Sequence, residues 1–172
     1  MKRRFGLLAI AAAVLATGPD VNACGDKSLS AGGIRIQRAL AARYPASVLA
    51  YVPANSPLAT AARELKLRQT LPWVGHRYRE VATLAELRAL VETGQFNIVL
   101  TDLGTAGDVE RDLGSSSPRV VFVPVAYKLT KAQAREAEKQ RRFLITAPSK
   151  AVDYLTTIAE AVALGSTGSR KG

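Results

Sequence analysis

One acidic residue stands at the end of an apolar run. The segment FNIVLTDLG, residues 96–104, has a β-branched centre, then Asp102, then a turn glycine. A carboxylate in this place is either the acidic tip of an active strand or a structural group. In the structural case, Asp102 caps the helix that follows or pairs with a nearby lysine.

Other polar residues fall where neighbouring strands are expected to end. Open α/β sheets bind ligands at the carboxyl ends of their strands, and the N-terminus of a helix offers amide donors to an anion. A small polar or anionic ligand could therefore sit at this edge, although Ser56 and Ser149 could equally be simple helix caps. The candidate residues are Asn55, Ser56, Thr101, Asp102, Lys128, Ser149 and Lys150.

Several other chemistries find no support in the sequence. His76 is the single histidine, and we expect it in a turn as a surface or packing residue. A G-x-S-x-G elbow is absent, and residues 105–108 lack the spacing and lysine of a phosphate loop. One cysteine, one histidine and scattered acids do not make a metal site. We therefore expect no catalytic residue, no metal and no cofactor.

Five short apolar segments predict the strands that position these residues. The third has an unbroken apolar centre at residues 98–100, as a central parallel strand buried on both faces requires. The predicted strands cover residues 47–52, 77–81, 96–102, 120–125 and 143–146.

Amphipathic segments alternate with these strands. The first, residues 34–44, has Ile36, Ala39, Leu40 and Ala42 as its expected apolar face, and no element is assigned to residues 68–76. The alternation predicts one α/β domain with a parallel five-stranded sheet and helices on both faces. Further helices are predicted at residues 58–67, at 84–93 behind a Thr83 cap, from Thr105 or Asp108 to about 113, at 130–140 and at 149–164.

The order of elements resembles the bacterial receiver, or CheY-like, domain over nearly the whole mature chain. The local sequence similarity lies in NIVLTDL in the third strand and FLITAPSK around the fifth. This resemblance implies a doubly wound (βα)5 fold of the flavodoxin/CheY type. In receivers the strand-three aspartate accepts a phosphoryl group, helped by two Mg²⁺-holding acids after strand one, a Thr or Ser after strand four and a lysine before the strand-five proline.

The chain matches these roles only in part. Asp102 matches the acceptor, but residues 52–55 contain no carboxylate and Ala147 replaces the lysine before Pro148. Residues 126–128 offer no small hydroxyl, and Lys150 lies two positions beyond the proline. We therefore expect a degenerate, non-enzymatic receiver, a protein-interaction or small-ligand-binding module. The alternative is a phosphoryl-accepting receiver at Asp102.

A partner surface is the other functional candidate. Receiver-like folds commonly bind partners around the last two strands and helices, as the resemblance implies. Trp73 and Tyr78 could also anchor a contact, although an inward Trp73 is an equal expectation. The expected basic face, suited to an acidic partner or a membrane surface, carries Tyr127, Lys128, Lys131, Arg135 and Lys139.

The N-terminus predicts export. Residues 2–4 are basic, residues 5–16 are apolar and Val21-Asn22-Ala23 is a small-residue cleavage site, the layout of a secretory signal peptide. Cys24 follows at once, so it is either a lipidation site or a free N-terminal thiol. The expected location is the periplasm, or the membrane surface on the outer side of the inner membrane or at the outer membrane.

The remaining domain boundaries follow from this cleavage. Residues 24–45 form a lead-in with a short helix, residues 46–164 the domain and residues 165–172 a disordered tail. Loss of residues 1–23 removes three cations and one acid, which lowers the net charge from +10 to +8. In an exported protein this charge favours lipid headgroups or acidic partners over nucleic acid. The leader ACGDK with the helix after it also resembles a group of exported bacterial proteins, a resemblance that implies export and no particular activity.

Overall fold

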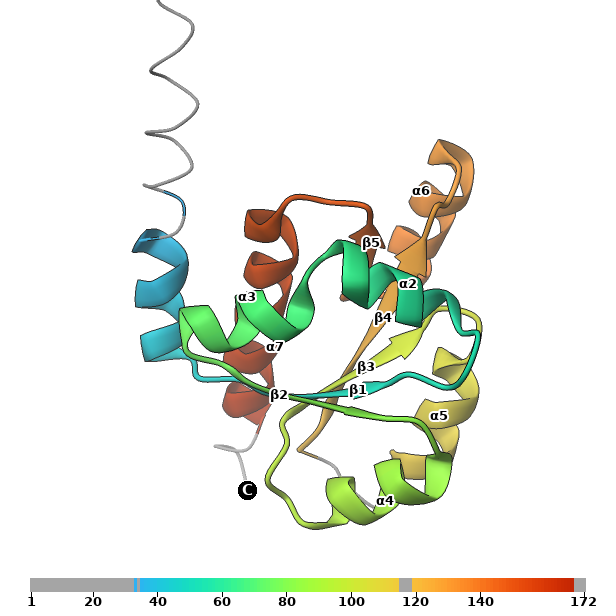
Figure 1. The fold of residues 1–172 in the computed structure, drawn as a ribbon, viewed down its shortest axis with the longest axis horizontal. Coiled ribbons are helices and arrows are strands. Elements are labelled where there is room, and N and C mark those ends of the chain that lie inside the picture. Colours follow the sequence, from blue (N-terminus) through green and yellow to red (C-terminus); the bar gives the residue numbers. More distant parts are fainter. Residues whose placement is uncertain (1–32, 34, 115–118, 169–172) are drawn as a thin grey trace, which may run out of the picture.

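The protein is built around one parallel sheet (Figure 1). The computed structural model describes residue 33, residues 35–114 and residues 119–168. The strand order is β2-β1-β3-β4-β5, so the chain reverses its direction across the sheet between β1 and β3. All neighbouring strands run parallel. The strands are β1 Ser47–Tyr51, β2 Arg77–Val81, β3 Ile98–Asp102, β4 Val121–Tyr127 and β5 Ile145–Ala147.

Helices cover both faces of the sheet, which gives the predicted three layers (Figure 1). One core packs α2, α3, α7 and the helix over residues 35–43 against the sheet, and the other packs α4 and α5 against the opposite face. α6 buries no residue and lies at the β4–β5 end. The helices are α2 Pro57–Glu64, α3 Leu67–Val74, α4 Leu84–Glu92, α5 Ala106–Leu113, α6 Lys131–Gln140 and α7 Ala151–Gly168.

All five predicted strands are confirmed, with ends that differ by at most two residues from the predicted ones. Their apolar patterns match burial in the sheet. β3 lies at the centre, and its residues 98–101 have no exposed surface. Two helix starts also follow their sequence signals. Thr83 Oγ1 accepts a hydrogen bond from the Glu86 amide at 3.2 Å, and Thr130 forms a reciprocal capping box with Gln133.

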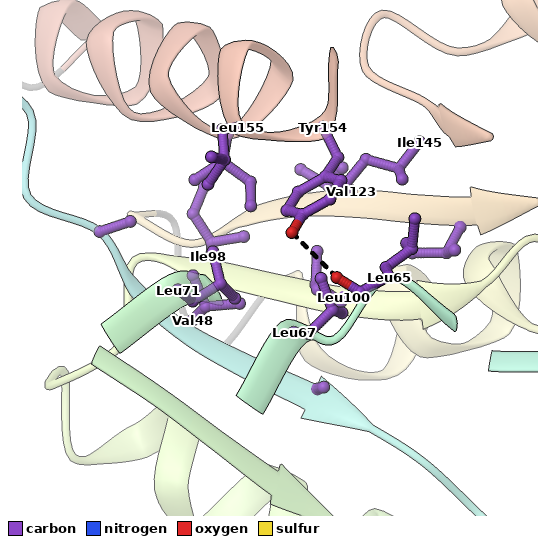
Figure 2. Close-up of a cluster of buried hydrophobic side chains, with 14 of the residues drawn as sticks. Val48, Leu65, Leu67, Leu71, Ile98, Leu100, Val123, Ile145, Tyr154 and Leu155 are labelled. Atoms are coloured by element: carbon purple, nitrogen blue, oxygen red, sulfur yellow. Dashed lines mark hydrogen bonds between the residues drawn. The ribbon is translucent and has the colours of Figure 1, made fainter. Parts of the chain in front are cut away.

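The predicted helix over residues 58–67 is wrong at its end. α2 stops at Glu64, Lys66 adopts a left-handed conformation with φ of 53°, and a separate helix, α3, begins at Leu67. The buried Tyr154 hydroxyl of α7 donates to the Leu65 carbonyl at 3.0 Å (Figure 2). This tertiary contact fixes the break, and local sequence patterns do not encode it.

The predicted apolar face of the first helix is also wrong. Ile36 is 61% exposed, whereas Gln37 is buried at 5% exposure. The Gln37 amide donates to Thr156 Oγ1 of α7 at 3.0 Å. A long-range hydrogen bond therefore satisfies a buried polar side chain and turns the helix by about one position relative to its hydrophobic pattern.

The end of the last helix requires a correction as well. α7 continues to Gly168, so residues 165–168 are helical rather than part of a tail. Residues 169–172, the predicted signal peptide and Cys24 lie outside the described residues. Within the described ranges, no helix is long and apolar enough to cross a membrane.

Candidate functional site

Asp102 closes a turn at the carboxyl end of β3. Its Oδ2 accepts a hydrogen bond from the Gly104 amide at 3.2 Å. Its carbonyl oxygen accepts from the Thr105 amide at 3.1 Å, directly before α5. The side chain is half-buried. The carboxylate therefore holds the turn that leads into the helix. The expected helix cap is wrong, because Thr105 occupies the N-cap position of α5.

Among the described residues at the ends of β1 and β5, no acid or lysine lies where the receiver resemblance would place one. β1 runs into Val52, Pro53 and Ala54, and β5 ends at Ala147. None of the ion pairs among residues 35–114 and 119–168 involves Asp102. The same residues contain no group of three His, Cys, Asp or Glu side chains that could hold a metal ion.

Tyr127 and Lys128, the predicted ligand residues at the end of β4, lie together and contact a helix rather than Asp102. The Tyr127 hydroxyl donates to Glu64 Oε1 of α2 at 2.7 Å. The Lys128 ammonium lies 5.0 Å from the Tyr127 ring centroid. Tyr127 and then the Glu64 carboxylate raise the pKa of the exposed Lys128 side chain. These contacts join β4 to α2.

The hydroxyl groups of Ser56 and Ser149, which the sequence suggested as helix caps, make no capping hydrogen bond. Ser56 precedes α2, yet its side chain makes no capping hydrogen bond. The hydroxyl oxygens of Ser56, Thr101 and Ser149 are buried without a hydrogen-bond partner. Neither serine therefore makes a side-chain cap, although Ser56 does occupy the predicted N-cap position before Pro57. Asn55 and Lys150 are exposed, and Asn55 adopts a left-handed conformation with φ of 63°.

A pocket of about 500 Å³ lies beside the break between α2 and α3. Val52 and Glu80 bring the carboxyl ends of β1 and β2 to it. The sequence does not reveal this pocket, because its walls come from four elements that only the fold brings together. The lining residues are Val52, Ala59, Ala62, Arg63, Lys66, Arg68, Gln69 and Glu80.

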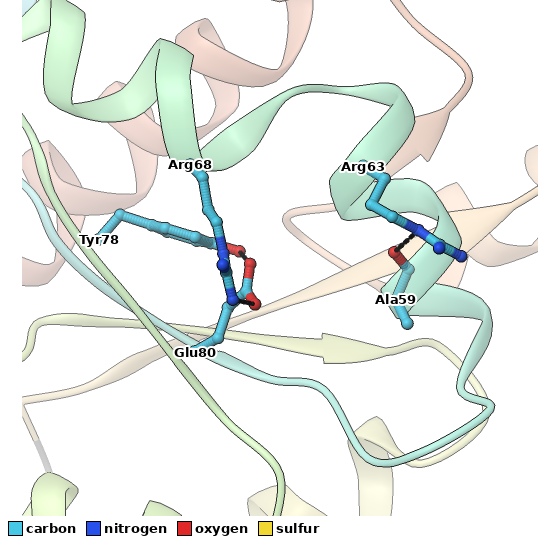
Figure 3. A network of polar contacts seen from close by, with 5 residues as sticks. All are labelled: Ala59, Arg63, Arg68, Tyr78 and Glu80. Atoms are coloured by element: carbon cyan, nitrogen blue, oxygen red, sulfur yellow. Dashed lines mark hydrogen bonds and ion pairs between the residues drawn. The ribbon is translucent and has the colours of Figure 1, made fainter.

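Glu80 is held by two neighbours at this pocket (Figure 3). Arg68 donates to its Oε2 at 2.5 Å and Tyr78 donates to its Oε1 at 2.9 Å. The hydrogen bond from Arg68 is the main cause that lowers the pKa of Glu80. Burial, followed by the Glu80 charge, raises the pKa of the Tyr78 phenol. Both carboxylate oxygens therefore already have partners.

The other two cations of the pocket have no acidic partner among the described ion pairs. Among the hydrogen bonds of the described residues, Arg63 donates only within its own helix, at 3.3 Å to the Ala59 carbonyl (Figure 3) and at 3.4 Å to Thr60 Oγ1. Lys66 is exposed at the helix break. The pocket therefore carries three cations against one carboxylate.

The two other residues discussed from the sequence are His76, which lies in the core, and Trp73, which lies at the surface. His76 is buried, and its Nδ1 accepts the Ala46 amide at 3.1 Å, as a packing residue does. Burial lowers the pKa of this imidazole. Trp73 is 52% exposed, so the inward alternative is wrong. The Arg38 guanidinium lies 4.5 Å from its ring centroid.

Comparison with known proteins supports the fold alone. No protein-family model and no curated protein sequence matches the chain. A solved structure described as an adenylate cyclase from Rhodopirellula baltica is similar, with a TM-score of 0.52 and 18% identity over 74% of this chain and 94% of that one. A response regulator receiver protein from Sinorhizobium medicae gives a TM-score of 0.51 and 15% identity over 70% and 97%. The receiver-like fold is confirmed.

Proposed function

We propose that this protein is an exported receiver-like domain that binds a small polar ligand or a protein partner and catalyses no reaction. The observation that carries this proposal is the setting of Asp102. The aspartate occupies the acceptor position at the end of β3, but residues 52–55 supply no acid and Ala147 supplies no cation.

The chemical reason lies in what phosphoryl transfer demands. The protein contributes mainly placed cations and a bound Mg²⁺, which neutralise charge in the transition state. Mg²⁺ prefers oxygen ligands with carboxylate charge. A single carboxylate that already accepts the Gly104 amide is a poor site for that ion.

Export rests on the leader sequence, whose layout is that of a secretory signal peptide. In an exported protein Asp102 would be separated from cytoplasmic kinases. The mass of the mature N-terminus tests this part of the proposal, since cleavage leaves Cys24 first, either free or lipid-modified. A protein that retains residues 1–23 and stays in the cytoplasmic fraction would contradict it.

Two kinds of binding are consistent with the surface. The pocket beside α2 and α3 suits a small molecule. The exposed face of α6 carries Lys131, Arg135 and Lys139, of which Lys139 pairs with Glu136 at 3.3 Å. This face suits an acidic partner or a membrane surface.

Magnesium titration tests the non-catalytic part of the proposal. In an amide NMR spectrum of the labelled protein, we expect the Gly104 and Thr105 resonances to stay in place as Mg²⁺ is added. Asp102→Asn serves as the control, because it removes the charge that would hold the ion. Saturable shifts of these two amides that disappear in Asp102→Asn would refute the proposal and favour a phosphoryl-accepting receiver.

A further inference from the structure

We infer that the pocket between α2, α3 and the ends of β1 and β2 is a binding site for a small organic anion, a compound with an apolar body and a carboxylate or phosphate group. This inference gives a ligand class to the binding module proposed above and rests on that proposal.

The helix break creates the pocket. Leu65 and Leu67 are both buried, so the two ends of the break are anchored in the core. Lys66 between them faces outward in a left-handed conformation. The pocket lies beside this break, with Val52 and Glu80 among its lining residues.

The pocket has an apolar part formed by small residues. Val52 contributes from the end of β1, and Ala59 and Ala62 lie one turn apart on α2. Small side chains at helical spacing leave volume that larger ones would fill. A volume of about 500 Å³ lies within the usual range for small-molecule sites and exceeds what a single inorganic phosphate fills.

The charged part selects for an anion. Arg68 balances the charge of Glu80, and Tyr78 donates to its other oxygen. Arg63 and Lys66 then have no acidic partner among the ion pairs of the described residues. The hydrogen bonds from Arg63 to its own helix are long, at 3.3 and 3.4 Å, so a ligand can replace them at little cost. Arg68 also keeps further N–H donors beside its bond to Glu80. Charge-assisted hydrogen bonds from such groups bind carboxylates and phosphates strongly.

A fluorescent anion with a neutral counterpart tests this inference on the protein purified in the form the cell produces. Anilinonaphthalene sulfonate has an apolar body and one anionic group, and N-phenylnaphthylamine lacks the charge. We expect saturable binding of the sulfonate and much weaker binding of the neutral amine. Equal affinity for the two probes would overturn the inference.

Matched variants locate the site. Arg63→Gln with Lys66→Asn removes two pocket charges, and asparagine tolerates the left-handed backbone at position 66. Lys131→Asn with Arg135→Gln removes two exposed charges on α6 and leaves the pocket intact. We expect the pocket pair to weaken sulfonate binding about tenfold or more and the α6 pair to change it less than about twofold. Equal effects of the two pairs would overturn the inference.

A third variant tests the volume without changing charge. Ala59→Leu places a larger side chain at a half-exposed helical position, where folding tolerates it, and should also weaken binding. Unchanged affinity would count against the pocket.

Competition of phenyl phosphate, benzoate and benzyl alcohol with the bound sulfonate then shows which polar group the pocket prefers. Displacement by either anion supports the inference and identifies the preferred group, whereas displacement by the neutral alcohol alone contradicts it. Binding is read by fluorescence and Mg²⁺ occupancy at Asp102 by NMR, so the pocket and the proposed function can fail independently.

Discussion

The hydrogen bond that fixes the helix break gives the most quantitative prediction. Tyr154 is 1% exposed, and its hydroxyl donates to the Leu65 carbonyl at 3.0 Å (Figure 2). Tyr154→Phe keeps the ring, so no sizeable cavity forms, but the buried carbonyl loses this donor. The loss of one buried hydrogen bond with its partner left unpaired lowers the free energy of unfolding by about 1–2 kcal/mol. The total free energy of unfolding of a native domain is about 5–15 kcal/mol.

Urea denaturation followed by circular dichroism measures this change. We expect a lower midpoint with an unchanged slope, because the surface exposed on unfolding stays the same. The corresponding fall in Tm is about 3–6 °C. Tyr51→Phe is the matched control, since none of the hydrogen bonds among the described residues uses the Tyr51 hydroxyl, and it should cost less than about 0.5 kcal/mol. Equal effects of the two substitutions would refute a stabilising role for the Tyr154–Leu65 bond.

Two further predictions concern the pH dependence of stability. The buried His76 has a lowered pKa, so the unfolded chain takes up a proton first and stability falls as pH drops below about 6.5. His76→Asn should flatten this slope between about pH 7 and 5 in denaturation curves, and an unchanged slope would exclude His76 as its source. Glu80 also has a lowered pKa, because Arg68 bonds to its carboxylate. The stabilisation is therefore present at neutral pH and is lost as pH falls below about 4.5. Because Arg68 is largely exposed, Glu80→Gln should cost only about 0.5–1 kcal/mol at pH 7. A cost that persists unchanged at about pH 3 would contradict the ion pair.

The strands could be predicted because their burial follows from the local pattern of apolar residues. The unbroken apolar centre of β3 matches its place between β1 and β4, where helices cover both faces. β2 was predicted with its observed bounds although only Val81 is fully buried.

Two of the failures share one physical cause, which is long-range contact. The Gln37–Thr156 hydrogen bond orients the first helix against its apolar pattern. The Tyr154–Leu65 bond accompanies a left-handed Lys66 that no helical propensity favours. The unassigned α3 has a local cause instead, since Pro72 lies inside this helix and proline usually interrupts one.

The candidate site was predictable only in part. The position of Asp102 and the lack of acids after the first strand could be predicted from the sequence. The reason is that the ends of adjacent strands are defined once the strand order is known. The pocket could not, because its charge depends on Glu80 being occupied by Arg68 and Tyr78 from separate elements. Ser56 looked like a helix cap in sequence, yet its hydroxyl makes no capping bond.

The most direct test of the central claim is the intact mass of the protein after incubation with Mg²⁺ and acetyl phosphate. A phosphorylatable receiver domain treated in parallel confirms that the donor is active. A domain that binds without phosphoryl chemistry keeps its mass unchanged. A stoichiometric phosphoryl adduct that is absent from Asp102→Asn would contradict this account.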